Sequence, residues 1–336
     1  MEVKTIDLLR SSRVDLAPQR IAGQAGNWNR LREAEGPVAT RTLGSATHLS
    51  ARPYEVADET AVLDLVNADR LRGQPLTTAV MLSDALATRS PVDSGWWAEL
   101  EPSRTDVVHD SAGKVLGVVS YSTRREDRTG LILWLHCRED EVVAEALVEH
   151  ALTSLGSPRT VYAFEFASAL TLGLEGLPVG ARPVTRKTLA AAGFSGRDAW
   201  RYIHRELTKV SDIVGSSSYP LAEVTECADP PGWQLLLRDT DGTEVAEATV
   251  GRPVDGIGVL WWISTDPAHR GRGLGRNLLE QCFHQLASNG AREVIAYVDD
   301  DAPPDDPKRD RTAANRLYDS MGFTEIDRLW SFTRRQ

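Results

Sequence analysis

The stretch "HRGRGLGRNLLEQCF", His269 to Phe283, is the most informative part of this sequence. Residues 270–276 hold three glycines and three arginines, and from Leu274 onward apolar residues recur with helical spacing. A loop without bulky side chains that runs into a helix N-terminus exposes backbone N–H groups, and the helix dipole favours negative charge there. The stretch therefore predicts an anion-binding loop at the start of a helix.

Two common phosphate-binding loops do not fit this spacing. A P-loop requires GxxxxGK followed by Ser or Thr, and neither Lys nor Ser or Thr follows these glycines. A dinucleotide-binding loop opens a βαβ unit near the start of a parallel sheet, whereas Gly271, Gly273 and Gly275 lie near the end of the chain. The sequence therefore argues against both a Mg-nucleotide and a dinucleotide.

The composition indicates a globular protein with an acidic surface. The chain has 336 residues, of which 41% are apolar and 26% charged, and its formal net charge is −10. This length favours two domains. We expect a cytoplasmic protein without membrane contact, because no run approaches about 18 apolar residues and no signal peptide pattern is present. The acidic charge argues against nucleic acid and favours a cationic partner. Three well-separated cysteines predict neither a disulfide framework nor a metal site.

The sequence contains an internal repeat. "HDSAGKVLGVVSYST" (109–123) and "RDTDGTEVAEATVG" (238–251) each indicate a hairpin, followed in both cases by a strand, a helix, a further strand and a helix that closes at Gly-Phe. The hairpin glycine and the closing glycine are 80 residues apart in both copies, as Gly113 and Gly193 and as Gly242 and Gly322. We interpret the chain as a tandem duplication.

The duplication predicts two α/β domains with a longer first copy. The expected boundaries are an N-terminal extension at 1–47, a first domain at 48–209, a linker at 210–218 and a second domain at 219–336. The first copy begins with a strand and two helix-period segments before its hairpin, whereas the second has only about 25 residues there, part of them linker. We expect the first copy to cover the sheet face that the second copy leaves bare.

Two motifs in the second copy resemble signatures of the GCN5-related N-acetyltransferases, the GNAT superfamily. Arg270, Gly273 and Gly275 match the pyrophosphate-loop pattern of Arg or Gln, x, x, Gly, x, Gly or Ala, and "RTAANRLYDSMGF" (311–323) resembles the second signature. The resemblance implies, in each domain, a mixed and mostly antiparallel sheet with a central splay, flanked by helices. The tandem layout is similar to mycothiol synthase-like acetyltransferases, whose C-terminal half is catalytic.

The resemblance also implies acetyl-CoA as the co-substrate and a set of residues that hold it. Backbone N–H groups near Trp262 and Ile263 would polarise the thioester carbonyl. Asn315 is included because Arg311 stands where the family often has an asparagine. The implied cofactor-binding residues are Trp262, Ile263, Thr265, Arg270, Gly271, Arg272, Gly273, Leu274, Gly275, Arg276, Asn315 and Tyr318.

The catalytic residues are a tyrosine and one of several carboxylates. Tyr318, from the second signature, is implied as the general acid for the departing thiolate. The central strand at 256–263 has no carboxylate, although many relatives place a glutamate there, so the candidate bases are Glu247, Asp255 and Asp299 to Asp301, with Asp299 preferred for its position. An amine delivered neutral would need none of them. Because side chains alternate along a strand, we expect one of Trp261 and Trp262 in the core and the other beside the acceptor.

The first copy has acids where the second has its glycine loop. Glu139, Asp140 and Glu141 suit a helix N-terminus but repel a pyrophosphate, so we expect no coenzyme A there. We therefore predict one site that transfers an acetyl group to a primary amine of a small cationic molecule, such as an antibiotic, another secondary metabolite or a mycothiol-type precursor. The chain is expected to be a monomer or homodimer. A non-catalytic CoA-binding protein and an acyltransferase for longer acyl-CoA stay open as alternatives.

Overall fold

The computed structural model describes residues 48–92, 94–156, 158–207, 221–299 and 311–335. The predicted extension, the predicted linker and most of the aspartate-rich segment at 299–310 therefore lie outside the described residues. Residues 47–336 form one structural unit. Among the described helices, none is both long enough and apolar enough to cross a membrane.

The first copy follows the order that its sequence pattern predicts. Apolar residues at helical spacing form α1 and α2, and runs of alternating or continuous apolar residues form the strands. Its elements are β1 (Ser50–Pro53), η2 (Val56–Asp58), α1 (Glu59–Ala68), α2 (Ala79–Leu86), α3 (Ser94–Ala98), β2 (Arg104–His109), β3 (Val115–Thr123), β4 (Gly130–His136), α4 (Glu141–Leu155), β5 (Thr160–Ala163), β6 (Leu177–Pro178), α5 (Pro183–Ala191) and β7 (Ser195–Glu206).

The second copy repeats this order from the hairpin onward. It begins with β8 in place of the first copy's strand and helices. Its elements are β8 (Glu223–Ala228), β9 (Pro231–Arg238), β10 (Glu244–Gly251), β11 (Ile257–Thr265), η4 (Pro267–His269), α6 (Leu274–Ser288), β12 (Glu293–Asp299), α7 (Thr312–Ser320) and β13 (Thr324–Arg335).

The four glycines that mark the repeat have matching backbone conformations. Gly113 and Gly242 turn the two hairpins with φ = 82° each, and Gly193 and Gly322 close α5 and α7 with φ = 87° and 81°. A positive φ costs glycine little because it has no Cβ, whereas other residues rarely adopt it. The equal spacing in the sequence therefore reflects the same local geometry in both copies.

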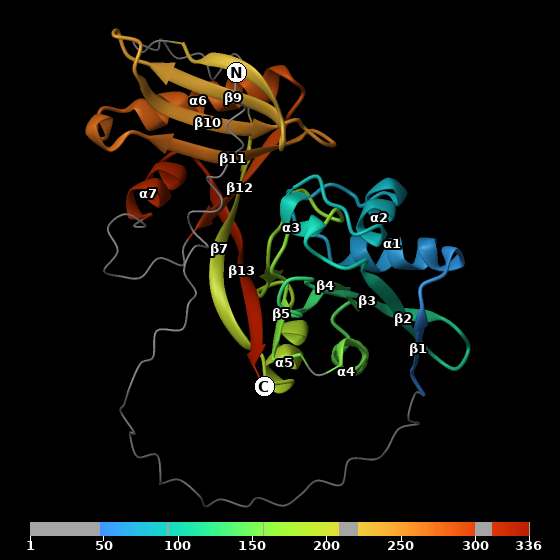
Figure 1. The fold of residues 1–336 in the computed structure, drawn as a ribbon. Helices are drawn as coiled ribbons and strands as arrows, with labels where there is room; N and C mark the ends of the chain where they lie inside the picture. The colour runs from blue at the N-terminus through green and yellow to red at the C-terminus, as the bar shows by residue number, and fades with distance from the viewer. Residues whose placement is uncertain (1–47, 93, 157, 208–220, 300–310, 336) are drawn as a thin grey trace, which may run out of the picture. The chain divides into compact units, whose positions relative to one another are not determined.

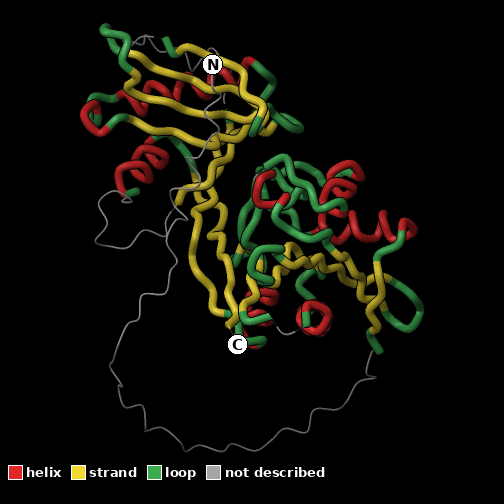
Figure 2. Tube along the Cα trace, viewed as in Figure 1, coloured by secondary structure: helices red, strands yellow, loops and turns green. Residues whose placement is uncertain are grey.

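The strands of both copies form one mixed sheet. The order is β1-β2-β3-β4-β5-β13-β7-β12-β11-β10-β9-β8, with β6 paired to β13 off this path. The last strands of the copies are exchanged: β7 pairs with β12 of the second copy, β13 pairs with β5 of the first, and β7 and β13 run side by side (Figure 1). Figure 2 shows this path as a continuous series of strands. Each copy is thus completed by a strand of the other.

Each copy contains one parallel pair of strands that separates. The pairing of β4 with β5 runs from Gly130 opposite Val161 to Ile132 opposite Ala163, and β4 then continues to His136 paired only with β3. The pairing of β11 with β12 runs from Ile257 opposite Glu293 to Leu260 opposite Ala296. Beyond Leu260, the edge of β11 that faces β12 has no strand partner among the described residues. The predicted fold class, a mixed sheet with a central splay and flanking helices, is confirmed.

The helices of each copy divide the sheet into two faces. In the second copy, α6 packs against alternate residues of β10 and β12, including Ala248 and Ala296, to form the main core. The opposite face holds a smaller cluster around Val259 and Ile295, and Leu71, Leu172 and Leu174 of the first copy pack onto it. The expectation that the first copy covers the bare face of the second is confirmed.

Candidate active site

The loop between β11 and α6 is open where the helix begins. Gly271 and Gly273 both have left-handed backbone, with φ = 76° and 80°, and Gly273 is the N-cap of α6 without a side-chain cap. A Cβ added at Gly271 would meet no described atom within 4 Å. The first backbone N–H groups of a helix have no partner within the helix itself. The start of α6 therefore presents donors beside a loop without side chains, as the sequence predicts.

The third loop glycine lies at the junction of three elements. A Cβ at Gly275 would lie 3.5 Å from Leu317 of α7 and 3.5 Å from Thr265 at the end of β11. Side chains larger than alanine would therefore push these elements apart. The first turn of α6, the end of β11 and α7 meet at this glycine, and they carry most of the residues predicted to hold the cofactor.

The arginines of the loop have different partners. Arg270 donates from Nε to the backbone oxygen of Thr265 at 3.2 Å, so it stays at the loop. Arg276 instead reaches α7, where Nη2 donates to Ser320 Oγ at 2.7 Å and Nη1 lies 2.9 Å from Met321 Sδ. Arg276 thus links the first turn of α6 to the end of α7 through its side-chain contacts.

Tyr318 lies in the core between α6 and α7. Its side chain is only 8% exposed and meets the ring of Phe323 edge to face at a centroid distance of 5.5 Å. Burial raises the pKa of the Tyr318 phenol, Cys282 raises it further, and the positive charge of Arg311 opposes the shift. The phenol therefore stays protonated throughout the neutral range and can act only as a proton donor there.

Arg201, a first-copy residue that sequence analysis missed, binds α7, the helix that carries Tyr318. Arg201, on the exchanged strand β7, donates to Asn315 Oδ1 at 2.9 Å, to Asp319 Oδ1 at 2.8 Å and to Glu325 Oε2 at 2.6 Å. Its side chain is 14% exposed. Asn315, predicted to face the cofactor, is thus bonded to Arg201. The sequence offered no signal for this contact, because Arg201 belongs to the other copy and its pairing depends on the strand exchange.

Glu247 lies on the face of the sheet opposite α6. Its Oε1 accepts from Trp262 Nε1 at 3.2 Å and from Ser264 Oγ at 3.4 Å. A β-bulge shifts the register so that Thr249 pairs with Trp262 and Val250 with Leu260, which leaves Trp261 as the extra residue.

This bulge overturns the expectation that Trp261 and Trp262 point to opposite faces. Trp261 stacks on Tyr297 at a centroid distance of 6.3 Å, and Tyr297 belongs to the cluster opposite α6. Trp262 reaches Glu247 on that same face. Strict alternation fails because the bulge inserts one residue into the strand, so both indoles lie on the face opposite α6.

The other two candidate bases that the structure describes, Asp299 and Asp255, lie at opposite ends of the β11–β12 pair. Asp299 ends β12, and because Ile295 and Tyr297 face away from α6, alternation puts Asp299 on that face too. Its Oδ2 lies 3.5 Å from Arg311 Nη2. Asp255 lies in the turn that opens β11, at the end of the strand remote from the glycine loop. The geometry therefore keeps Glu247 and Asp299 as candidates and separates Asp255 from them.

The matching turn of the first copy is closed. It has four residues between β4 and α4, Cys137 to Asp140, against eight between β11 and α6. The side chain of Asp140 caps α4 by accepting from the backbone N–H of Val143 at 3.1 Å. Glu139 turns away and accepts from the backbone N–H groups of Val184 and Thr185 at the start of α5. An acid of the chain itself thus occupies the helix N-terminus that is open in the second copy.

Comparison with known proteins assigns the second copy to a class. Residues 231–325 match the model of the acetyltransferase (GNAT) domain, so this part of the chain is a GNAT domain. The relatives it matches include the mycothiol acetyltransferase of Thermomonospora curvata, 35% identical over 96 residues, which are 29% of this chain and 29% of that protein. The mycothiol acetyltransferase of Thermobispora bispora is 41% identical over 68 residues, 20% of each chain. The matched part spans less than a third of either relative.

Solved structures extend the likeness to both copies at the level of fold. A tandem GNAT protein from the clavulanic acid biosynthesis pathway superposes with a TM-score of 0.58 at 16% identity, covering 86% of this chain and 98% of that one. A GCN5-related N-acetyltransferase from Sphaerobacter thermophilus gives a TM-score of 0.53 at 17% identity, with 85% and 95% covered. The chain therefore has the tandem GNAT fold, with the conserved sequence signal in its second copy.

Proposed function

We propose that the chain is an acetyl-CoA-dependent N-acetyltransferase with a single active site in residues 219–336, acting on a primary amine of a small cationic molecule. The observation that carries this proposal is the uncapped start of α6 behind Gly271 and Gly273, inside a GNAT domain. Residues 48–209 are proposed as a second domain of the same fold without coenzyme A, and the whole as a monomer or homodimer.

The donor side is formed by α6, α7 and the end of β11. The N–H groups at the start of α6 and the guanidinium of Arg270 suit a pyrophosphate. The open backbone edge of β11 after Leu260, at Trp262 and Ile263, suits the thioester arm. Acetyl-CoA would supply an activated acetyl group, whose C–S bond breaks as the C–N bond to the amine forms.

The residues of the chain would move two protons during this transfer. On the face opposite α6, Glu247 or Asp299 accepts the proton that the amine loses. On the α6 side, Tyr318 donates its phenolic proton to the departing thiolate, since burial keeps that phenol protonated. The two carboxylates and the tyrosine lie on opposite faces of the splay, which suits an acceptor and a donor that approach from opposite sides.

The proposed acceptor side carries negative charge and aromatic surface from both copies. Glu247 accepts a hydrogen bond from Trp262, and Asp299 and Trp261 lie on the same face of the sheet; indole faces and carboxylates together favour a cation. Segments of the first copy close this face: Gln74 Nε2 donates to Tyr297 Oη at 3.0 Å and Gly173 packs against Trp261. A face that the first copy covers in this way favours a small molecule over a protein tail.

The test is a thiol-release assay with acetyl-CoA and a panel of small amines, repeated with succinyl-CoA and malonyl-CoA. We expect turnover with acetyl-CoA on a cationic amine, and a larger loss for Glu247→Gln than for Asp299→Asn if Glu247 accepts the proton. Binding of acetyl-CoA without turnover on any amine, together with no effect of Tyr318→Phe, would support the non-catalytic alternative. Faster turnover with a longer acyl-CoA would support the other alternative.

A further inference from the structure

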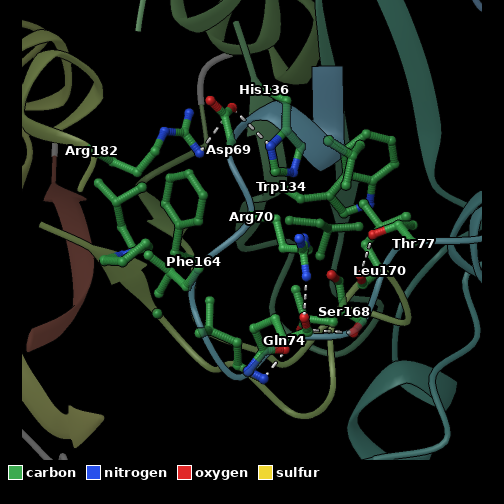
Figure 3. Close-up of a pocket in the computed structure, with 18 of the residues that line it drawn as sticks. Asp69, Arg70, Gln74, Thr77, Trp134, His136, Phe164, Ser168, Leu170 and Arg182 are labelled. Carbon is green, nitrogen blue, oxygen red and sulfur yellow. Dashed lines mark hydrogen bonds and ion pairs between the residues drawn. The ribbon is translucent and has the colours of Figure 1, made fainter. Parts of the chain in front are cut away.

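The first copy contains a cavity of about 60 Å³ on the face of its sheet that α1 and α2 cover (Figure 3). Its walls come from β4, from the end of α1 with the loop that follows, and from the segment after β5. A bulge at Leu133 matches the bulge at Trp261, so Trp134 of the cavity corresponds to Trp262. The cavity is therefore the first copy's counterpart of the proposed acceptor side.

One end of the cavity is occupied by two carboxylates, one guanidinium and an imidazole that already pair with one another. Asp69 Oδ2 lies 3.0 Å from His136 Nδ1 and 3.5 Å from Arg182, which also pairs with Glu139 at 2.5 Å. Glu139 in turn binds the start of α5. Burial lowers the pKa of His136 despite the opposing effect of Asp69, so this imidazole is neutral at pH 7. The carboxylate of Asp69 thus already has partners and is a poor site for a further cation.

Two of the remaining polar groups of the lining, Arg70 and Trp134, can only donate hydrogen bonds. The guanidinium of Arg70 lies between Trp134 and Gln74 in Figure 3, and its Nη1 donates to the backbone oxygen of Gln74 at 2.8 Å. Within the described part of the chain, no carboxylate pairs with Arg70. Trp134 is 3% exposed, and its indole N–H has no hydrogen-bond partner among the described residues. A cation and a buried donor therefore border this cavity without an acidic partner.

The rest of the lining is apolar and limits the size of an occupant. It consists of first-copy side chains from α1, β4 and the segment after β5, chiefly Val66, Leu133, Phe164, Phe166 and Leu170. A single water needs about 10–15 Å³ of such volume, so the cavity has room for about four waters or a ligand of about four to six non-hydrogen atoms.

We propose that this cavity binds a short-chain monocarboxylate, with the carboxylate at Arg70 and the hydrocarbon part against Phe164 and Phe166. An anion matches the exposed guanidinium of Arg70, which donates to a backbone oxygen and has no carboxylate partner among the described residues, and hydrogen bonds to charged groups are the stronger kind. An ammonium ligand is disfavoured, because Asp69 is already shared by His136 and Arg182. This binding site is separate from the glycine loop and from Tyr318, and acetyl transfer in the second copy does not require it.

The experiment is an NMR titration of the full chain with butyrate, butyramide and n-butylamine, which have similar size and differ in charge. The reporter is the indole N–H resonance of Trp134, assigned by its loss in Trp134→Phe. We expect butyrate to shift it saturably with a millimolar Kd, and butyramide to bind at least about tenfold more weakly. Arg70→Met should weaken butyrate by about tenfold. The matched control is Arg72→Met, which removes a surface pair with Glu206 and should change nothing.

Three results would overturn the proposal. These are equal binding of butyrate and butyramide, tighter binding of n-butylamine, and no saturation by butyrate up to about 50 mM, as for a cavity that holds only water. Circular dichroism checks that Arg70→Met folds. If it does not fold, the three probes on the unchanged chain still decide the question.

Discussion

The turn from β4 into α4 and the turn from β11 into α6 occupy the same place in the two copies but differ in chemistry. Arg138 and Glu139 adopt positive φ in the first turn, and Asp140 caps the helix with its own carboxylate. In the second turn the positive φ values belong to Gly271 and Gly273, and the cap has no side chain. One helix N-terminus is capped by a side chain of the chain itself, and the other has no side-chain cap.

This difference teaches that a shared fold does not fix where a ligand binds. Both copies keep the hairpin, the splay and the helix behind it, so the architecture alone would allow two equal sites. A few residues at the helix start decide which copy can accept an anion, because the dipole and free N–H groups act only within the first turn.

Giving the second copy the cap of the first should abolish binding of acetyl-CoA. In Gly273→Asp the new carboxylate takes the free N–H groups of α6 and adds negative charge, so two or three charge-assisted hydrogen bonds of about 1.5–3 kcal/mol each are lost. We expect affinity to fall about a thousandfold by isothermal titration calorimetry. The control is Gly242→Asp, at a hairpin glycine with similar φ and open space. Unchanged affinity in Gly273→Asp would contradict the assignment of the loop.

Removing the proposed proton donor should slow turnover without weakening binding. Tyr318→Phe keeps the ring that packs against Phe323, so the fold should be retained. A positioned general acid contributes at least about a hundredfold, so kcat should fall by that factor with the KM for acetyl-CoA little changed. Phe323→Leu serves as the control, since it changes the same packing but keeps the phenol. A fall in binding equal to the fall in kcat would indicate that Tyr318 only packs.

Removing the contact between Arg201 and α7, the helix that carries Tyr318, should lower kcat by a smaller factor. Arg201→Met removes the three hydrogen bonds that the guanidinium makes to Asn315 and Asp319 of α7 and to Glu325 of β13. Misplacing a catalytic group lowers the rate, and we expect about a tenfold drop in kcat. Arg201→Lys should restore part of it, and Arg252→Met, which removes an exposed pair with Glu226, should not alter it. Full activity in Arg201→Met would show that the exchanged strand does not position the site.

The smallest expected effect is on the pH dependence of the free energy of unfolding. It comes from His136, which lies at the position that Ser264 has in the second copy. Burial lowers the pKa of His136 in the folded chain, while the unfolded value is about 6.5. Its contribution to stability is therefore present above about pH 6.5 and is lost as the pH falls toward the lowered pKa. Urea unfolding from pH 7 to 5 should show this loss, at most about 1.4 kcal/mol per pH unit, and His136→Ser should flatten the slope. An equal slope in both proteins would contradict the shift.

Much of the fold follows from the sequence because its signals are local. The periodicity of apolar residues predicts helices such as α4 and α6, and the spacing of Gly113 and Gly193 against Gly242 and Gly322 predicts the duplication. The exchange of β7 and β13 could not be predicted, because both strands are patterned alike and their partners lie far away in the chain.

The residues of the candidate site also fall into two groups, those that local motifs predict and those that depend on contacts between distant parts of the chain. The glycine loop and the tyrosine are contiguous motifs, so their elements were predicted from the residues around them. Arg201 was missed because it reaches α7 from the other copy, and the common face of Trp261 and Trp262 was missed because a bulge leaves no clear mark in the sequence. Contacts that depend on non-local pairing need the structure.

The central claim is that only the second copy binds coenzyme A, and native mass spectrometry with acetyl-CoA tests it most directly. The account predicts a single acetyl-CoA per chain in the unchanged protein and none in Gly273→Asp. Two molecules per chain, or one that persists in Gly273→Asp, would contradict it, because the capped helix of the first copy would then be a binding site after all.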